Sequence, residues 1–211
     1  MKHLETQEVV SGIFVIRTKP SNFYIVSNGD GYIAIDAGGG NKNAIRNELS
    51  KLSINPDKVT AVLLTHTDFD HISALSLFKN ATIYLSKQEV QMIDGSVSRM
   101  FFVKNRLKYD YKTIENSEEI YSGNVKLKSI FTPGHTNGST TYLLDDKYLF
   151  VGDTLSLQNG HVGLFSSFFN MSDDMQRKSI NNLAKLQNVE YIFTCHYGFS
   201  NDFHVAFRGF Q

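Results

Sequence analysis

The stretch "LLTHTDFDH", residues 63–71, decides how the fold of this chain is interpreted. Four side chains that can bind a metal, His66, Asp68, Asp70 and His71, fall directly after a short apolar run. The first three are spaced by two, which places them on one side of an extended chain. Imidazole and carboxylate together suit zinc, iron or manganese. The alternative, a helix-capping Asp70 among ordinary polar loop residues, does not explain such a concentration of ligands.

Three further candidate ligands follow apolar runs later in the chain. "KSIFTPG" leads to His135, "KYLFVG" to Asp153 and "VEYIFTC" to His196, as "AVLLT" leads to His66. Each run has the length and composition of a strand. A single histidine or aspartate after a strand is an ordinary capping or turn residue. Four occurrences predict that loops at the ends of several strands converge on one point.

Helical patterns stand between groups of strands rather than after every strand. They cover residues 41–52, 86–93 and 172–188, and "ISALSLF" suggests that another helix begins near Asp70 and His71. Ser86 and Glu89 have the spacing of a capping box, and Ser172 is a candidate N-cap. Blocks of strands with helices outside predict an α/β protein with two packed sheets covered by helices. One domain over residues 1–211 is the simplest organisation, with the strand-helix grouping repeated before and after residue 120.

Composition narrows the possible partners. The formal net charge is zero, from 21 basic and 21 acidic residues, so no global electrostatic signal for nucleic acid or an anionic membrane is present. The single cysteine, Cys195, fits a reducing compartment. We find no apolar segment of signal-peptide or membrane-spanning character. We therefore expect a soluble cytoplasmic protein that acts on a small molecule, with no nucleic acid and no membrane as partner.

Residues 95–112 form a basic segment with interleaved aromatic residues. Five cations stand against the single acid Asp110. One interpretation is a solvated loop or helix whose apolar residues 100–102 join the core. The other is a wall over a pocket that favours anionic groups. The sequence alone favours the first interpretation.

The chain resembles the metallo-β-lactamase superfamily. "THTDFDH", "PGHTNGS", "GDT" and "CHYG" are similar, in order and spacing, to its metal-binding motifs, and "AIDAGGG" around Asp36 is similar to its early strand-turn signature. The resemblance covers about Gly12 to Gly198. It implies a four-layer αββα sandwich, with the metal site at one edge where the two sheets meet.

The resemblance also implies a set of ligands for two divalent metal ions, with zinc the first expectation and iron or manganese open. A water or hydroxide between the metals is then the nucleophile, because a bound cation lowers the pKa of water from about 15.7 towards 7. Asp36 is expected to support the ligand loops. Carried over by position, the first metal takes His66 and His135, the second takes Asp70, His71 and His196, and Asp153 bridges both.

Asp68 departs from the family pattern. The motif normally reads His-any-His-any-Asp-His, so an aspartate stands here in place of the second histidine. As a ligand, Asp68 leaves the site one charge unit less positive and favours harder metals such as manganese or iron. In the alternative, Asp68 only forms hydrogen bonds and the enzyme is mononuclear. We expect ligation.

Other residues carry weaker expectations. Cys195 is expected to pack inward as a small hydrophobe, because adjacent residues of an extended segment point to opposite faces. Tyr197 is a candidate catalytic residue that stabilises an oxyanion, with core packing as the alternative. Asn159 and His161 are candidates for the pocket wall. His3 and His204 are expected on the surface.

These features together favour a metal-dependent hydrolase that uses a metal-bridging hydroxide to cleave an ester, thioester, lactone or phosphodiester bond. Asp70 is expected to orient the nucleophile and pass a proton to the leaving group. The chain continues little beyond His196, so the glutathione-binding helical domain of larger glyoxalase II enzymes is not expected. A diiron oxidoreductase, similar to sulfur dioxygenases, is the alternative activity, and a binding module without catalysis is the third possibility. The basic segment favours an anionic substrate.

Overall fold

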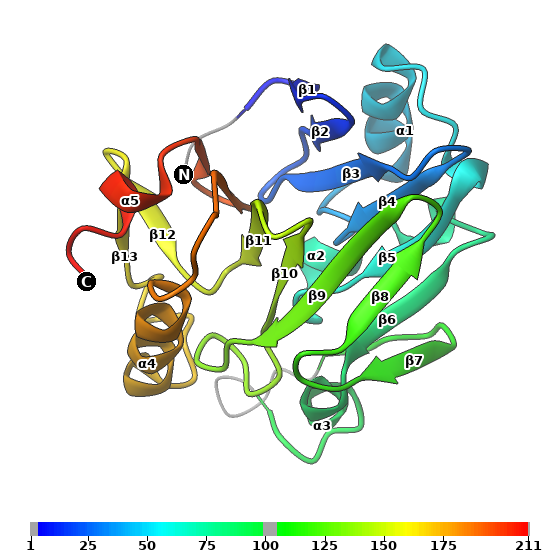
Figure 1. Ribbon diagram of the computed structural model, residues 1–211. Helices are drawn as coiled ribbons and strands as arrows, with labels where there is room; N and C mark the ends of the chain where they lie inside the picture. The colour runs from blue at the N-terminus through cyan, green and yellow to red at the C-terminus, as the bar shows by residue number, and fades with distance from the viewer. Residues whose placement is uncertain (1–3, 99–104, 211) are drawn as a thin grey trace.

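Two β-sheets form the centre of the molecule, and helices cover their outer faces (Figure 1). The computed structural model describes residues 4–98 and 105–210. The first sheet has the strand order β1-β2-β3-β4-β5-β6-β7. Its strands are antiparallel from β1 to β4 and parallel from β4 to β7. Their bounds are Gln7–Val10, Ile13–Ile16, Phe23–Ser27, Tyr32–Ile35, Val59–Leu63, Thr82–Ser86 and Tyr111–Ile114.

The second sheet comes from the later half of the chain and has the order β15-β14-β11-β10-β9-β8. Only β11 and β14 pair in parallel. Its strands in chain order are β8 Glu119–Ser122, β9 Val125–Phe131, β10 Thr140–Leu144, β11 Tyr148–Gly152, β14 Tyr191–Thr194 and β15 Gly198–Ser200. A separate hairpin pairs β12 Ser156–Gln158 with β13 His161–Gly163.

Three apolar clusters define the layers. One lies between the sheets and includes Tyr24, Tyr142 and Phe193. A second packs helices α1 and α3 against the outer face of the first sheet, and a third packs α4 and α5 against the second. The predicted αββα sandwich is therefore confirmed. The helices are α1 Lys42–Lys51, α2 Phe69–Ile72, α3 Val90–Ile93, α4 Asp173–Leu183 and α5 Phe203–Ala206, with short 3₁₀ turns at Pro56–Lys58, Leu75–Leu77 and Lys87–Glu89.

Two local predictions need correction. The helix expected from Asp70 onward is only the four-residue α2 followed by a 3₁₀ turn, so Asp70 and His71 lie inside a very short helix. The capping box is half formed. Ser86 accepts the Glu89 backbone N–H as predicted, but the Glu89 carboxylate bonds to Thr67 and Thr136 instead of returning to the helix start.

Contacts between the sheets hold the strand ends together. The Tyr142 hydroxyl donates to the Leu64 carbonyl at 2.8 Å, and the Thr140 backbone N–H donates to the Thr65 carbonyl at 2.8 Å. Gly152 has φ +54°, and a Cβ there would lie 2.5 Å from the Thr65 hydroxyl oxygen. Glycine is needed at this point because both the backbone angle and the close approach exclude a side chain. Thr65 and Gly152, which directly precede His66 and Asp153, are thereby held in contact with each other.

The basic segment is partly described. Residues 99–104, which include the cations Arg99 and Lys104 and the apolar residues 100–102, lie outside the described residues, as does His3. Residues 105–108 have no helix or strand, and Tyr111 begins β7. Within residues 4–98 and 105–210, none of the helices has the length and apolar character needed to cross a bilayer.

Candidate metal centre

Seven predicted ligands converge at the edge where the C-terminal ends of strands from both sheets meet. His66, Asp68, Asp70 and His71 follow β5, while His135, Asp153 and His196 follow β9, β11 and β14. Three groups drawn from these seven residues each hold ligand atoms within 4.8 Å of one another. These groups are His66, Asp68 and His135; Asp70, His71 and His196; and His66, His71 and Asp153.

Three of the histidines are oriented by partners outside the cluster. The Nδ1 atom of His66 lies 3.0 Å from the Thr65 hydroxyl, and that of His71 lies 2.8 Å from Asp36 Oδ2. Since Thr65 donates its hydroxyl proton to Asp36, its oxygen accepts from His66 Nδ1. His135 Nδ1 lies 3.3 Å from the Asn170 side-chain oxygen. Each bond turns the Nε2 atom inward, which is how metal-binding imidazoles are commonly oriented.

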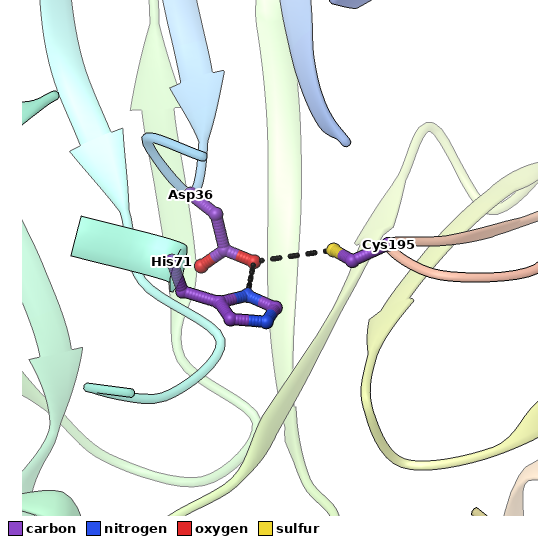
Figure 2. Close-up of side chains that lie close together, drawn as sticks. All are labelled: Asp36, His71 and Cys195. Carbon is purple, nitrogen blue, oxygen red and sulfur yellow. Dashed lines mark hydrogen bonds and ion pairs between the residues drawn. The ribbon is translucent and has the colours of Figure 1, made fainter. Parts of the chain in front are cut away.

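Asp36 is the buried anchor of this arrangement (Figure 2). Its Oδ1 accepts the Thr65 backbone N–H at 2.7 Å, and its Oδ2 accepts from His71 and from the Cys195 thiol at 3.5 Å. Asp36 has φ +63°, a conformation that aspartate tolerates better than most residues. Cys195 is buried as predicted, but it faces a carboxylate rather than an apolar interior, and burial raises the pKa of its thiol.

Buried polar atoms inside the cluster have no hydrogen-bond partner among the described residues. They include His66 Nε2, His71 Nε2 and Asp153 Oδ1. Each such atom costs free energy unless something compensates it, and a cation is the group that satisfies imidazole nitrogens and a carboxylate oxygen together. The donor set therefore fits a divalent metal.

The proton states of the cluster differ from one ligand to the next. Burial, with the nearby His71, lowers the pKa of His66 to about 4, so this imidazole is neutral. Burial opposes the charge on His196, but Asp153 outweighs it and raises the pKa of His196 to about 9. Burial likewise opposes ionisation of Asp153, yet His196 and His71 hold its pKa well below the ordinary range. Burial also opposes the charge on His71, but Asp153 and Asp36 outweigh it and raise the pKa of His71 well above the ordinary value. A cation entering the cluster therefore meets an ionised Asp153 and displaces protons from His71 and His196.

Asp68 lies inside the cluster rather than turned to solvent. Its Oδ2 lies 3.3 Å from His135 Nε2 and 3.5 Å from His66 Nε2. Its other oxygen accepts a hydrogen bond of 3.1 Å from Asn105, which also donates to the Thr67 hydroxyl at 3.0 Å. One carboxylate oxygen thus faces the two imidazoles while the other is held by an amide.

Sequence reasoning missed Glu89 as a residue of this site. Its fully buried carboxylate accepts the Thr67 backbone N–H and hydroxyl at 2.8 and 2.7 Å, and the Thr136 hydroxyl at 2.6 Å. Thr67 lies between His66 and Asp68, and Thr136 follows His135. Burial raises the pKa of Glu89. Glu89 therefore ties the two ligand loops together, and only its capping-box spacing was visible in the sequence.

The cluster opens into a cavity of about 680 Å³. Asp68, Asp70, His135, Asp153 and His196 line it, and so do Arg106 and Lys108 of the basic segment. The interpretation of this segment as a wall of the pocket therefore fits these two cations better than the solvated-loop interpretation.

Three weaker candidates lie elsewhere. Tyr197 packs edge-on against Phe165, with ring centroids 5.8 Å apart, and does not contribute to the described cavity lining, which fits the packing alternative. Asn159 and His161 were expected in the pocket wall, and that expectation is wrong. Both are exposed at the turn of the β12-β13 hairpin, away from the described lining residues. His204 is exposed on α5, as expected.

Comparison with known proteins identifies the family of the chain. A family model described as the metallo-beta-lactamase superfamily matches residues 16–196. A probable metallo-hydrolase of Methanocaldococcus jannaschii is 29% identical over 157 residues, covering 74% of this chain and 66% of that protein. A probable polyketide biosynthesis zinc-dependent hydrolase of Bacillus velezensis is 31% identical over 130 residues, covering 53% of this chain and 52% of the other.

Solved structures agree on the fold. A metallo-beta-lactamase variant from Cronobacter sakazakii superposes with a TM-score of 0.73 at 20% identity, covering 92% of this chain and 80% of the other. The matched region spans between about half and two thirds of the length of the two curated relatives. Because the family model matches most of the sequence and the αββα architecture agrees, the chain belongs to the metallo-β-lactamase superfamily.

Proposed function

We propose that this protein is a metal-dependent hydrolase that cleaves an ester, thioester, lactone or phosphodiester bond of a small molecule. One observation carries the proposal: Nε2 atoms and carboxylate oxygens face one another at the floor of a cavity. Three of the four imidazoles are oriented by a hydrogen-bond partner at Nδ1. The names of the curated relatives, a metallo-hydrolase and a zinc-dependent hydrolase, support the same activity.

In this proposal two divalent cations, with zinc first and iron or manganese as alternatives, occupy neighbouring positions. The distances between ligand atoms support two separate metal positions, because two groups of neighbouring ligands have no residue in common. These groups are His66, Asp68 and His135, and Asp70, His71 and His196. Asp153 bridges both positions, since its Oδ2 lies within 3.3 to 4.0 Å of all four imidazole Nε2 atoms. The first position takes His66, Asp68 and His135, and the second takes Asp70, His71 and His196.

The bound cations supply Lewis acidity and lower the pKa of a water, which makes hydroxide available near neutral pH. Asp70 is the proton carrier. Its carboxylate lines the cavity, with Oδ2 3.4 Å from His196 Nε2, and its pKa is low because His71 and His196 outweigh the effect of burial. Asp70 is therefore ionised, and in this proposal it accepts a proton from the attacking water and returns it to the leaving oxygen or sulfur. Tyr197, whose placement fits packing, has no step in this proposal.

The test combines metal analysis with a substrate panel. Protein purified without added metal is analysed for zinc, iron and manganese, and its visible absorbance is recorded for iron. We expect two divalent ions per chain and hydrolysis of at least one of the four bond classes. The variant His66→Ala/His196→Ala, which removes one ligand from each position, is expected to lose both metal and activity. Two irons without any hydrolysis overturn the proposal in favour of a diiron oxidoreductase.

A further inference from the structure

Two side-chain amides at the start of helix α4 pair with each other behind the candidate ligands. The Asn170 Nδ2 atom donates to Gln176 Oε1 at 2.9 Å, and the Gln176 Nε2 atom donates to Asn170 Oδ1 at 2.9 Å. Gln176 is fully buried, and Asn170 is partly buried just before the helix. The amide pair, Asn170 and Gln176, is thus closed, since each member satisfies a donor and an acceptor of the other.

Further partners fix which way round each amide lies. The Gln176 oxygen also accepts the Phe165 backbone N–H at 3.0 Å, and the Gln176 nitrogen also donates to the Asp153 carbonyl at 3.3 Å. The Asn170 nitrogen lies near two more acceptors, the Phe165 carbonyl at 3.2 Å and Asp173 Oδ1 at 2.7 Å. A backbone N–H only donates and a carbonyl only accepts, so a flipped amide would place like groups against each other.

The orientation of Asn170 selects the tautomer of His135. The Asn170 oxygen lies 3.3 Å from His135 Nδ1. An amide oxygen only accepts, so the proton of the neutral imidazole belongs on Nδ1 and the lone pair on Nε2. His135 Nε2 lies 3.5 Å from Asp153 Oδ2, inside the ligand cluster. The amide pair therefore holds this ring in the form that binds a cation.

Phe165 connects the amide pair to further ligands. Its backbone N–H and carbonyl both bond to the pair, and its ring packs edge-on against His135, with centroids 4.9 Å apart. The same ring lies 5.6 Å from the His196 ring. The Gln176 bond to the Asp153 carbonyl adds a third ligand. Ligands that follow β9, β11 and β14 therefore share one support.

We propose that Asn170 and Gln176 are positioning residues that act as one unit on both candidate metal positions. Asn170 fixes the tautomer and the ring orientation of His135. Gln176 fixes the Asp153 carbonyl, and both amides hold the backbone of Phe165. This inference rests on the proposed function for its two metal positions, but not on which bond is hydrolysed.

Zinc affinity in the full chain is measured first, by competition titration with a chromophoric chelator. We expect Asn170→Ala to weaken binding at the first position about tenfold, because His135 loses its acceptor. Asn170→Asp keeps an oxygen towards His135 Nδ1 but places a carboxylate beside Asp173. We therefore expect this variant to unfold at lower urea concentration and yet retain its zinc affinity. An equal loss of affinity in both variants overturns the role of Asn170.

Asn28→Ala is the matched control for a purely structural effect. The buried Asn28 side chain accepts the Gly31 backbone N–H at 3.0 Å and donates to the Ser122 hydroxyl at 2.8 Å. It lies at the opposite end of β4 from Asp36. We expect Asn28→Ala to lower the free energy of unfolding and leave both zinc affinities unchanged. A loss of affinity as large as that in Asn170→Ala shows that stability alone explains the effect, and overturns the inference.

NMR of the zinc-loaded protein with isotope-labelled histidine follows the Nδ1–H proton of His135. The signal is assigned by its absence from His135→Ala. We expect slow exchange of this proton with water in the unaltered protein, in Asn28→Ala and in Asn170→Asp, and loss of the signal through fast exchange in Asn170→Ala. Slow exchange that persists in Asn170→Ala contradicts the hydrogen bond on which the inference depends.

A double-mutant cycle tests whether the amide pair acts as one unit. Gln176→Met removes the second amide at similar volume, and we expect it to weaken zinc about tenfold at both positions. For a single unit, the double variant Asn170→Ala/Gln176→Met loses less affinity than the product of the two single losses. Losses that simply multiply overturn the single unit. Two zinc ions bound without hydrolysis overturn the hydrolase alone, since the variant affinities still decide the positioning role. An unaltered protein that binds no divalent ion overturns both.

Discussion

Asn105 donates a hydrogen bond to one oxygen of Asp68, at 3.1 Å, while the other Asp68 oxygen lies 3.3 Å from His135 Nε2. The amide therefore sets which way the carboxylate faces. Asp68 stands where the family motif is expected to carry histidine, and Asn105 is a partner that suits a carboxylate at this position. Partners of this kind commonly change metal affinity by about 10–100-fold when removed.

We expect Asn105→Ala to weaken binding at the proposed first metal position about tenfold, because Asp68 loses a hydrogen bond that helps to orient it. The measurement is a competition titration with a chromophoric chelator, which resolves two affinities per chain. Asn80→Ala is a suitable control, since the Asn80 side chain donates to the Asp57 carbonyl in an exposed turn. Equal metal affinities in Asn105→Ala and the unaltered protein contradict this role.

Substitution of Asp68 itself decides whether it is a ligand. We expect Asp68→Ala to lose one metal equivalent per chain, because in the proposed arrangement only His66 and His135 then remain beside Asp153 at the first position. Asp68→His is expected to retain or improve zinc occupancy, since imidazole suits zinc well. Metal content is measured after extensive dialysis. Unchanged occupancy in Asp68→Ala shows that Asp68 is not a ligand.

Glu89 allows a test with a conservative variant. Glu89→Ala leaves the buried Thr67 N–H without an acceptor and opens a cavity, so we expect a loss of about 3 kcal/mol in the free energy of unfolding. Glu89→Gln keeps an acceptor towards Thr67, and Thr136 can reverse its role and accept from the new amide. Denaturant unfolding measures both, and Gln is expected to recover most of the loss. A Gln variant as unstable as the Ala variant shows that the charge, not the bonding pattern, is required.

Removal of metal is expected to destabilise the fold. Ligand present at 100 times its dissociation constant adds about 2.7 kcal/mol, and for a chain of this size each kcal/mol moves Tm by about 2–4 °C. Chelation is therefore expected to lower Tm by about 5–10 °C, and added zinc to restore it. Thermal scans of the His66→Ala/His196→Ala variant provide the control, since zinc is expected to leave its Tm unchanged.

Cys195 is expected to resist thiol reagents in the folded protein. Its side chain is 2% exposed, and burial raises the pKa of the thiol, so the reactive thiolate is scarce at neutral pH. Labelling by iodoacetamide is followed by mass spectrometry in buffer and in denaturant. We expect slow labelling in buffer and rapid labelling when unfolded. Fast labelling of the folded protein contradicts the burial of this side chain.

The sequence predicted well those features that a short segment of chain determines by itself, such as where a strand ends. The apolar run before His66 and the similar runs before His135 and His196 end where the structure has strand ends, because period and length are visible within a few residues. The short edge strands β1 and β7 went unrecognised. Most of their residues are exposed or only partly buried, so they lack the alternation that marks a strand with one buried face.

The contacts that support the site depend on residues distant in sequence and were not predictable in this way. Glu89 reaches Thr67 across 22 positions and Thr136 across 47, while Asn105 reaches Asp68 across 37. The alternation argument placed Cys195 inside correctly, but it did not show that Asp36, 159 positions earlier, would face it. Side-chain partners of this kind follow from tertiary packing, which no local pattern records.

The division of the candidate ligands between the two sheets gives a bound cation a mechanical role. His71 lies shortly after β5 of the first sheet and His196 follows β14 of the second, while the backbone passes from one sheet to the other through the short connection between Ile114 and Glu119. A metal held by both histidines would act as a removable cross-link. Like a covalent bridge, it would close a loop, here of about 125 residues, and reduce the conformational entropy of the unfolded chain wherever it stays attached.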